Sequence, residues 1–319
     1  MKFFSTLLVL ILFAAGCNET ELQQSAPAHE VDPEQLLRDV RILSDDYFEG
    51  RKTDSKGGFL AQGYVIARFS GIGLRSFSDT YTQPFETVNQ RSGEAFDDAA
   101  NIIGYVEGTE NPDEYIVVTA HFDHLGVRNG DIYNGADDNA SGVGGMLAAA
   151  EWFKNNPPQN SMLFIGFDAE EQGLAGARYF VGNPVVPLES IIMNVNMDMI
   201  SLNYENEIYA AGTYHYPFLR PIIEESTASA PVNVLFGHDS PDLPSGDDWT
   251  MSSDHGPFHT AGIPFIYFGV EDHPYYHRPE DIFENITPDF YYNSVTTIIN
   301  VISEFDKQSE QIKEMSERF

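Results

Sequence analysis

Short apolar runs alternate with amphipathic segments along most of the chain. Leu36, Val40 and Leu43 follow Asp32 at helical spacing, and Asp32 itself precedes the proline and glutamate typical of a helix start. Further helices are predicted over 57–71, 141–154, 174–181 and 290–306, and strands over 101–106, 115–120, 161–167, 191–197 and 263–268. This alternation predicts an α/β fold, a three-layer α/β/α sandwich around a mixed, mostly parallel twisted sheet.

The N-terminus has the pattern of an export signal. Lys2 precedes an apolar run from Phe3 to Ala15 that is too short to span a bilayer. Small residues then lead to Cys17 and resemble a bacterial lipobox, although a cleaved signal with an incidental cysteine is the alternative. We expect residues 1–17 to be a lipoprotein signal peptide, 18–30 a flexible tether and 31–319 a single domain. The protein would then be an exported bacterial lipoprotein, anchored through a lipid on Cys17 at the periplasmic face or the outer-membrane surface.

Composition excludes several classes of function. The 319 residues include 49 Asp and Glu against 17 Lys and Arg, a formal net charge of −32. Such a surface repels phosphate backbones, so nucleic acid is excluded as a partner. Cys17 is the only cysteine, which rules out an intrachain disulfide, a catalytic cysteine and a cysteine-ligated zinc site. The acidity serves solubility, metal binding or both.

Histidine and carboxylate residues follow the predicted strands. Ligands of open α/β sheets bind outside the carboxyl ends of the strands, so these residues are expected in one crevice. The candidates are His121, Asp137, Glu170, Glu171 and Asp198. A cluster of imidazole and carboxylate groups without cysteine suits zinc, with Co²⁺ or Mn²⁺ also tolerated.

Five short segments occur in a distinctive order. They are 43–51 (LSDDYFEGR), 121–126 (HFDHLG), 133–142 (YNGADDNASG), 169–173 (AEEQG) and 253–255 (SDH). Together they resemble the co-catalytic zinc aminopeptidase family, the group that also contains the glutamate carboxypeptidases and glutaminyl cyclases. The resemblance covers most of the chain after the tether. It implies a zinc peptidase catalytic domain with two Zn²⁺ ions.

The resemblance also implies a set of metal ligands. One zinc would be held by His121, Asp198 and Asp137, and the other by Asp137, Glu171 and His277. Asp137 would therefore bridge the two ions. A non-proline cis peptide is expected directly after Asp137.

Further roles are carried over in the same way. Glu170 would be the catalytic general base. Asp123 would accept the other ring N–H of His121 and fix its tautomer. Asp254 and His255 are expected to line the substrate pocket, whereas His124 is expected to point away from the ligands and to shape the loop.

The implied activity is that of a metallo-aminopeptidase that hydrolyses N-terminal residues from peptides. A carboxylate-rich crevice attracts the free α-ammonium of a peptide, which favours this activity over that of a carboxypeptidase. A carboxypeptidase needs a cationic group for the terminal carboxylate, and Arg278 beside His277 could provide one, so this activity stays an alternative. A glutaminyl cyclase, which uses a single zinc on the same fold, is the main alternative. An inactive binding relative is disfavoured because every implied ligand and Glu170 are present.

Overall fold

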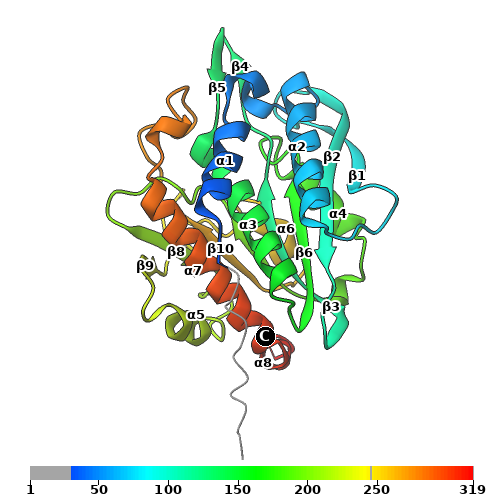
Figure 1. Cartoon of the computed structure of the whole chain (residues 1–319), viewed down its shortest axis with the longest axis vertical. Helices are drawn as coiled ribbons and strands as arrows, with labels where there is room; N and C mark the ends of the chain where they lie inside the picture. Colours follow the sequence, from blue (N-terminus) through cyan, green and yellow to red (C-terminus); the bar gives the residue numbers. More distant parts are fainter. Residues whose placement is uncertain (1–29, 245, 319) are drawn as a thin grey trace, which may run out of the picture.

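The computed structural model describes residues 30–244 and 246–318. Over these residues, eight strands form one sheet in the order β1-β2-β6-β3-β7-β10-β8-β9 (Figure 1). Their bounds are β1 (Thr82–Val88), β2 (Ala95–Val106), β3 (Asn111–His121), β6 (Asn160–Phe167), β7 (Ile191–Met197), β8 (Glu207–Ala211), β9 (Asn233–Leu235) and β10 (Phe265–Gly269). A separate hairpin is formed by β4 (Gly126–Arg128) and β5 (Asp131–Tyr133).

The middle of the sheet is parallel and its flanks are antiparallel. Strands β6, β3, β7 and β10 run in one direction. On one side β2 pairs antiparallel with β6, and on the other β8 pairs antiparallel with β10. The four parallel strands therefore bring their carboxyl ends to the same edge of the sheet, as the mixed, mostly parallel topology predicted from sequence requires.

Helices cover both faces of the sheet. Figure 1 shows α1, α2, α3 and α7 in front of it. The helices are α1 (Pro33–Leu43), α2 (Lys56–Ile72), α3 (Gly142–Asn155), α4 (Ala175–Gly182), α5 (Arg220–Thr227), α6 (His255–Thr260), α7 (Pro288–Lys307) and α8 (Ser309–Ser316), with short helical turns η1 (Asp46–Arg51), η2 (Ala136–Ser141), η3 (Leu188–Ser190) and η4 (Phe283–Asn285).

Side chains of the central strands alternate between two separate hydrophobic cores. In β3, Ile116 and Val118 pack with residues of α1, α2, α3 and α7, whereas Val117 packs with residues of α4 and α6. In β6, Phe164 packs in the first of these cores and Ile165 in the second. Because successive strand residues point to opposite faces, this alternation means that both faces are buried under helices. The three-layer α/β/α sandwich predicted from the sequence is confirmed.

The first helix begins as its sequence indicates. The Asp32 side chain accepts hydrogen bonds from the backbone N–H groups of Glu34 and Gln35, 2.9 and 3.2 Å away, and Pro33 occupies the first helical position. A side-chain acceptor at this place satisfies N–H groups that have no partner within the helix. Leu36 and Val40 then lie on the buried side of α1, as their spacing predicts.

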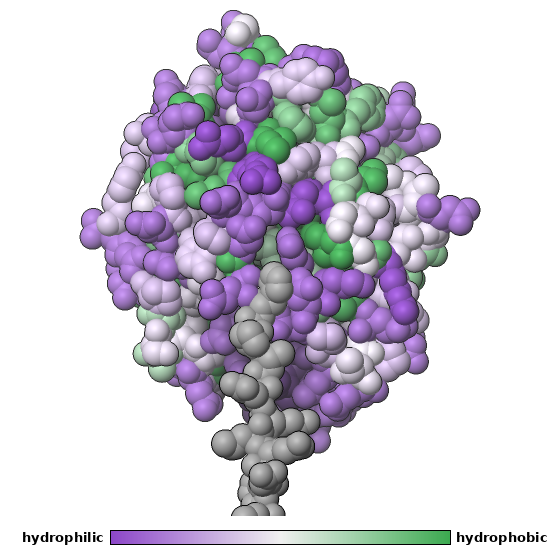
Figure 2. All heavy atoms as spheres, viewed as in Figure 1, coloured by the Kyte–Doolittle hydropathy of each residue, from purple (hydrophilic) through white to green (hydrophobic). Residues whose placement is uncertain are grey.

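The predicted signal peptide, Cys17 and the tether up to residue 29 lie outside the described residues. Within 30–244 and 246–318, no helix is both long enough and apolar enough to cross a membrane. Figure 2 shows hydrophilic side chains spread widely over the face that carries α1, α2, α3 and α7, with smaller apolar patches between them. The domain boundaries assigned from the sequence stay a prediction.

Candidate metal centre

The carboxyl ends of the parallel strands meet at a cavity of about 210 Å³. His121 is the last residue of β3, Glu170 and Glu171 follow β6, and Asp198 follows β7 directly. His277 lies on the segment after β10. All five side chains line the cavity. The fold therefore assembles residues that are up to 156 positions apart in the chain.

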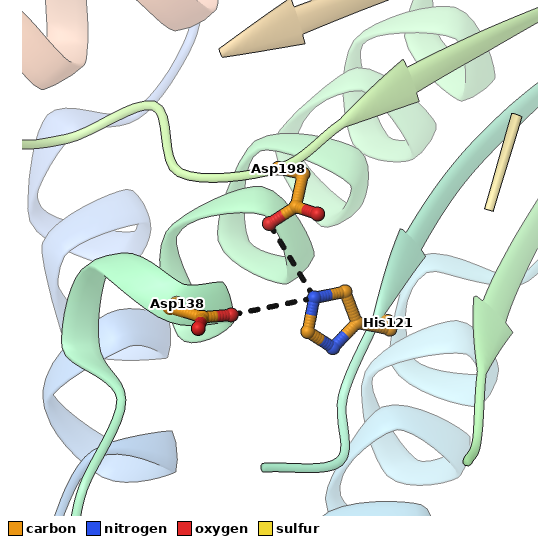
Figure 3. Close-up of side chains that lie close together, drawn as sticks. All are labelled: His121, Asp138 and Asp198. Atoms are coloured by element: carbon orange, nitrogen blue, oxygen red, sulfur yellow. Dashed lines mark ion pairs between the residues drawn. The ribbon is translucent and has the colours of Figure 1, made fainter. Parts of the chain in front are cut away.

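One group of donors is centred on His121. Its Nε2 lies 3.4 Å from Oδ1 of Asp138 and 3.4 Å from Oδ1 of Asp198. Figure 3 shows both carboxylates directed at this same ring nitrogen. Burial alone would lower the pKa of His121, but the charges of Asp198 and Glu170 raise it well above its usual value. Burial would raise the pKa of Asp198, but the imidazole of His121 lowers it below its usual value.

A second group lies on the other side of Asp138. Its Oδ2 is 3.1 Å from Nε2 of His277 and 3.6 Å from Nδ1 of His124. Oε1 of Glu171 is 2.9 Å from the same nitrogen of His124 and 3.6 Å from Nε2 of His277. Asp138 thus presents one carboxylate oxygen to each group, the arrangement of a bridging ligand.

The two groups fit metal ions. Donors around a tetrahedral zinc lie roughly 3.3 Å apart when each is about 2.0–2.1 Å from the ion. The separations of His121 and His277 from their carboxylate partners, 3.1–3.6 Å, agree with this spacing. Oε1 of Glu171 is buried without a hydrogen-bond donor. A buried carboxylate oxygen without a donor is costly unless a cation faces it.

Asp137 does not occupy the bridging position that the sequence analysis gave it. Its Oδ1 accepts hydrogen bonds from the backbone N–H and the hydroxyl of Ser201, both at 2.7 Å, and from the Ser141 hydroxyl at 3.3 Å. Its Oδ2 lies 3.1 Å from Nε2 of His273. These partners turn the carboxylate away from His121, so Asp138 takes its place. The cis peptide also lies one residue later than predicted, between Asp138 and Asn139.

Residues distant in sequence hold the loop that carries Asp138. The two carboxylate oxygens of Asp281 accept hydrogen bonds from the backbone N–H groups of Asp137 and Asp138, at 2.8 and 3.0 Å. Burial raises the pKa of Asp281 to about 7. The buried guanidinium of Arg51 donates hydrogen bonds to four backbone carbonyls, those of Leu43, Phe122, Asn134 and Gly135, at 2.5–2.9 Å.

Asp123 positions the segment of Glu170 rather than only a histidine ring. Its two carboxylate oxygens accept the backbone N–H groups of Glu170 and Glu171 at 3.0 and 3.3 Å. Nδ1 of His121 lies 3.1 Å from the backbone carbonyl of Asp123 and 3.7 Å from its carboxylate. The carbonyl therefore takes the ring N–H that the sequence analysis assigned to the carboxylate.

Glu170 lines the cavity but belongs to neither donor group. Burial raises its pKa well above the usual value, and the neighbouring charge of Glu171 adds to this. The turn that presents it begins at Ala169, whose φ is 59°. A carboxylate placed beside two groups that could hold metal ions, without joining either, is free to accept and return a proton.

Asp254 and His255 do not line the cavity, contrary to the expectation from sequence. Both are completely buried at the start of α6. The ring of His255 stacks on Phe265 with centroids 4.6 Å apart, and its Nε2 lies 2.8 Å from the backbone carbonyl of Trp249. Packing of α6 against β10 therefore places these side chains behind the cavity wall.

Several side chains that line the cavity or face its donors were not identified from the sequence. Trp249, Tyr267 and Tyr276 form aromatic walls of the cavity. The Tyr276 ring stacks on His277, with centroids 3.9 Å apart, which holds that imidazole in place. His124 was expected to point away from the ligands but faces Glu171. Only Tyr276 had a signal in the sequence, its position next to His277.

Known proteins resemble this chain in sequence and in fold. Aminopeptidase YwaD of Bacillus subtilis is 35% identical over 201 residues, which are 59% of this chain and 40% of that protein. A solved zinc aminopeptidase of Bacillus subtilis, BSAP, superposes with a TM-score of 0.68 at 17% identity, covering 88% of this chain and 97% of that one. A solved glutaminyl cyclase of Bacteroides thetaiotaomicron superposes with a TM-score of 0.70 at 19% identity, covering 86% of this chain and 99% of that one.

The match to YwaD leaves more than half of that relative without a counterpart here. The likeness of the solved structures shows a shared fold. Residues 101–302 match the sequence profile of peptidase family M28, and this region contains the strand ends and all the donors described above. The chain belongs to peptidase family M28.

Proposed function

We propose that the protein is a zinc aminopeptidase that removes single residues from the N-termini of peptides with two zinc ions. One observation carries the proposal: two donor groups share Asp138 and meet Glu170 in a single cavity. Similarity to aminopeptidase YwaD supports it. Co²⁺ or Mn²⁺ would bind the same donors.

The residues divide between the ions as follows. The first ion would be held by His121, Asp138 and Asp198, and the second by Asp138, Glu171 and His277. Bound zinc ions supply Lewis acidity, which polarises a carbonyl and lowers the pKa of water. The cluster of buried carboxylates is the protein's contribution to holding that positive charge.

Glu170 would handle the protons of the reaction. Its carboxylate accepts a proton from the attacking water and delivers it to the leaving amine. Asp123 keeps Glu170 at the cavity by holding its backbone N–H, 3.0 Å from a carboxylate oxygen. A raised pKa suits this role, since the group must both take up and release a proton near neutral pH.

The walls of the cavity favour an N-terminal residue as the substrate group. Trp249, Tyr267 and Val270 offer apolar surface to its side chain. Among the described lining residues no Lys or Arg occurs, whereas Asp272 adds a further carboxylate at the rim. An α-ammonium is therefore attracted and a terminal carboxylate is repelled.

A wider groove of about 1040 Å³ adjoins the cavity and shares Glu170, Glu171 and Tyr276 with it. This groove would take the rest of the peptide. Arg91 and Arg178 lie along it, where they can meet carboxylates further down the substrate. The larger space thus lies on the side of the leaving group.

Mass spectrometry of two peptides tests the proposal, one beginning with Leu and one with Gln. Purified enzyme should release the free first residue, and a chelator should stop the release until zinc is restored. Loss of ammonia from the Gln peptide, with the chain otherwise intact, would instead establish a glutaminyl cyclase. Cleavage at the C-terminus would identify a carboxypeptidase, and no reaction on either peptide or on C-terminal substrates would indicate a binding protein.

We also propose that the protein is exported and anchored in the bacterial envelope through a lipid on Cys17. Support comes from the sequence alone: an apolar segment that ends in small residues before the only cysteine. Cys17→Ser should move the protein from the membrane fraction to the soluble fraction and abolish its labelling by a fatty-acid probe. Equal distribution of the wild type and the variant would contradict the anchor.

A further inference from the structure

His124 is a buried imidazole without a hydrogen bond on either ring nitrogen. Its exposed fraction is 0%, and both Nδ1 and Nε2 lack a hydrogen-bond partner among the described residues. Oε1 of Glu171, 2.9 Å from Nδ1, is also buried without a hydrogen-bond partner. Buried polar groups are almost always satisfied, because leaving them unpaired is costly. Two buried ligand atoms that face one another without a hydrogen bond indicate a cation that both of them bind.

The position of Nδ1 matches that of the ligand proposed above, His277. It lies 3.6 Å from Oδ2 of Asp138, and Nε2 of His277 lies at 3.1 Å from the same oxygen. Both nitrogens also lie within 3.6 Å of Oε1 of Glu171. The two imidazoles therefore approach the same pair of carboxylate oxygens.

Close packing fixes the ring in this orientation. Gly135 has a φ of 56°, and a Cβ at this position would lie only 2.5 Å from Cδ2 of His124. The backbone N–H of His124 donates to the carbonyl of Arg51, 3.3 Å away. Glycine at this position thus leaves room both for the backbone carbonyl of Asp138 and for the imidazole, and the close contact restricts rotation of the ring.

We propose that His124 is a fourth protein ligand of the second metal ion, binding through Nδ1 beside Asp138, Glu171 and His277. The proposal rests on the two-zinc centre proposed above. The second ion then has four protein ligands, whereas the first has three. A four-ligand site is closed, while a three-ligand site keeps a position open for a reacting group. The two ions therefore have different tasks.

The two histidines of the second site differ in how much of their side chain is exposed to solvent. The His277 side chain is 39% exposed and that of His124 is 0% exposed. The buried ligand should dominate retention of the ion, since solvent and chelators reach His277 first. Removing His124 should weaken zinc binding at one site on the order of a hundredfold, at least as much as loss of a group that only supports a ligand.

Competition between the metal-free protein and a chromogenic chelator measures this affinity. The wild type should bind two zinc ions, and His124→Gln should bind one with unchanged affinity and the other on the order of a hundredfold more weakly. His259→Gln is the matched control, because it removes an imidazole whose Nδ1 lies 2.8 Å from the Tyr216 hydroxyl. It should bind both ions as the wild type does. Two sites of wild-type affinity in a folded His124→Gln chain would overturn the proposal.

A second variant keeps the test independent of that result. Nδ1 is the ring nitrogen nearer the backbone, and zinc–sulfur bonds of about 2.3 Å exceed zinc–nitrogen bonds of about 2.0–2.1 Å, so a cysteine thiolate reaches a similar point. His124→Cys loaded with Co²⁺ should show a sulfur-to-cobalt charge-transfer band. The wild type, which has only Cys17, should not show it. If the wild type binds a single zinc, the two-zinc centre is wrong. The charge-transfer band of His124→Cys would then still show that residue 124 binds the metal, and its absence would show that it does not.

Discussion

Asp137 and Asp138 are neighbours in the chain, but their carboxylates face different partners. Asp138 presents Oδ1 to His121 at 3.4 Å and Oδ2 to His277 at 3.1 Å. Asp137 accepts two hydrogen bonds from Ser201 at 2.7 Å. The first arrangement leaves both oxygens available to cations, whereas the second commits an oxygen to hydrogen-bond donors of the protein. We therefore expect Asp138 to bind the proposed metal ions and Asp137 to stabilise the loop.

Replacing each of these two aspartates separates metal binding from stability. Asp138→Asn should reduce bound zinc from two ions to one or none and abolish turnover, because an amide cannot bridge two cations. Asp137→Asn should retain both ions but lower the free energy of unfolding by about 1–3 kcal/mol, as its hydrogen bonds weaken. Metal analysis and urea unfolding measure the two effects. Loss of zinc in Asp137→Asn with retention in Asp138→Asn would reverse the assignment.

Glu170→Gln should remove proton transfer and leave the metal centre intact. We expect turnover to fall by roughly 10²–10⁴-fold, since this is the usual contribution of a positioned general base. Zinc content should equal that of the wild type. Glu171→Gln is the comparison, because its carboxylate faces His124 and His277 and its loss should deplete zinc. Normal activity in Glu170→Gln would remove Glu170 as the base.

Arg51 is expected to stabilise the loops that carry the ligands. Arg51→Met leaves four buried backbone carbonyls without their donor, so the free energy of unfolding should fall by about 3 kcal/mol or more. Arg220→Met is the control, since Arg220 is exposed and its guanidinium contacts the Glu224 carboxylate and the Phe236 ring rather than buried carbonyls. It should change stability little. Urea unfolding measures the stability of both variants. If Arg51→Met were as stable as Arg220→Met, Arg51 would have no structural role.

The contact between His273 and Asp137 should make stability depend on pH. Burial alone would lower the pKa of His273, but Asp137 raises it above its usual value of 6.5. Protonated His273 therefore stabilises the fold fully below about pH 6.5, and this contribution is lost as the pH rises through the raised pKa. His273→Gln should destabilise the metal-free protein more at pH 6 than at pH 9. In an Asp137→Asn background, His273→Gln should destabilise the protein equally at pH 6 and pH 9. If the pH dependence persisted there, a group other than Asp137 would cause it.

The sequence predicted the elements that supply the ligands better than it predicted the loops between them. His121, Glu171 and Asp198 follow apolar strands with a clear pattern, and strand direction alone brings them together. Strands β1, β8 and β9 were missed, because the apolar pattern in them is weak; β1 and β9 form the two edges of the sheet, and β8 lies next to β9.

The choice between Asp137 and Asp138 could not be made from the sequence. Both lie in a loop without periodicity, and both backbone N–H groups are held by Asp281, more than 140 residues away. His124 was misjudged for a similar reason: Gly135 packs against its ring, and Arg51, 73 residues away, accepts its backbone N–H. Side-chain direction in these loops depends on tertiary contacts that local patterns do not encode.

Anomalous scattering at the zinc edge, from crystals grown with zinc, tests the two-metal centre most directly. We predict two peaks with Asp138 between them. One peak should lie beside His121 and Asp198, and the other beside Glu171, His277 and His124. A single peak, or a peak bound by Asp137 in place of Asp138, would contradict it.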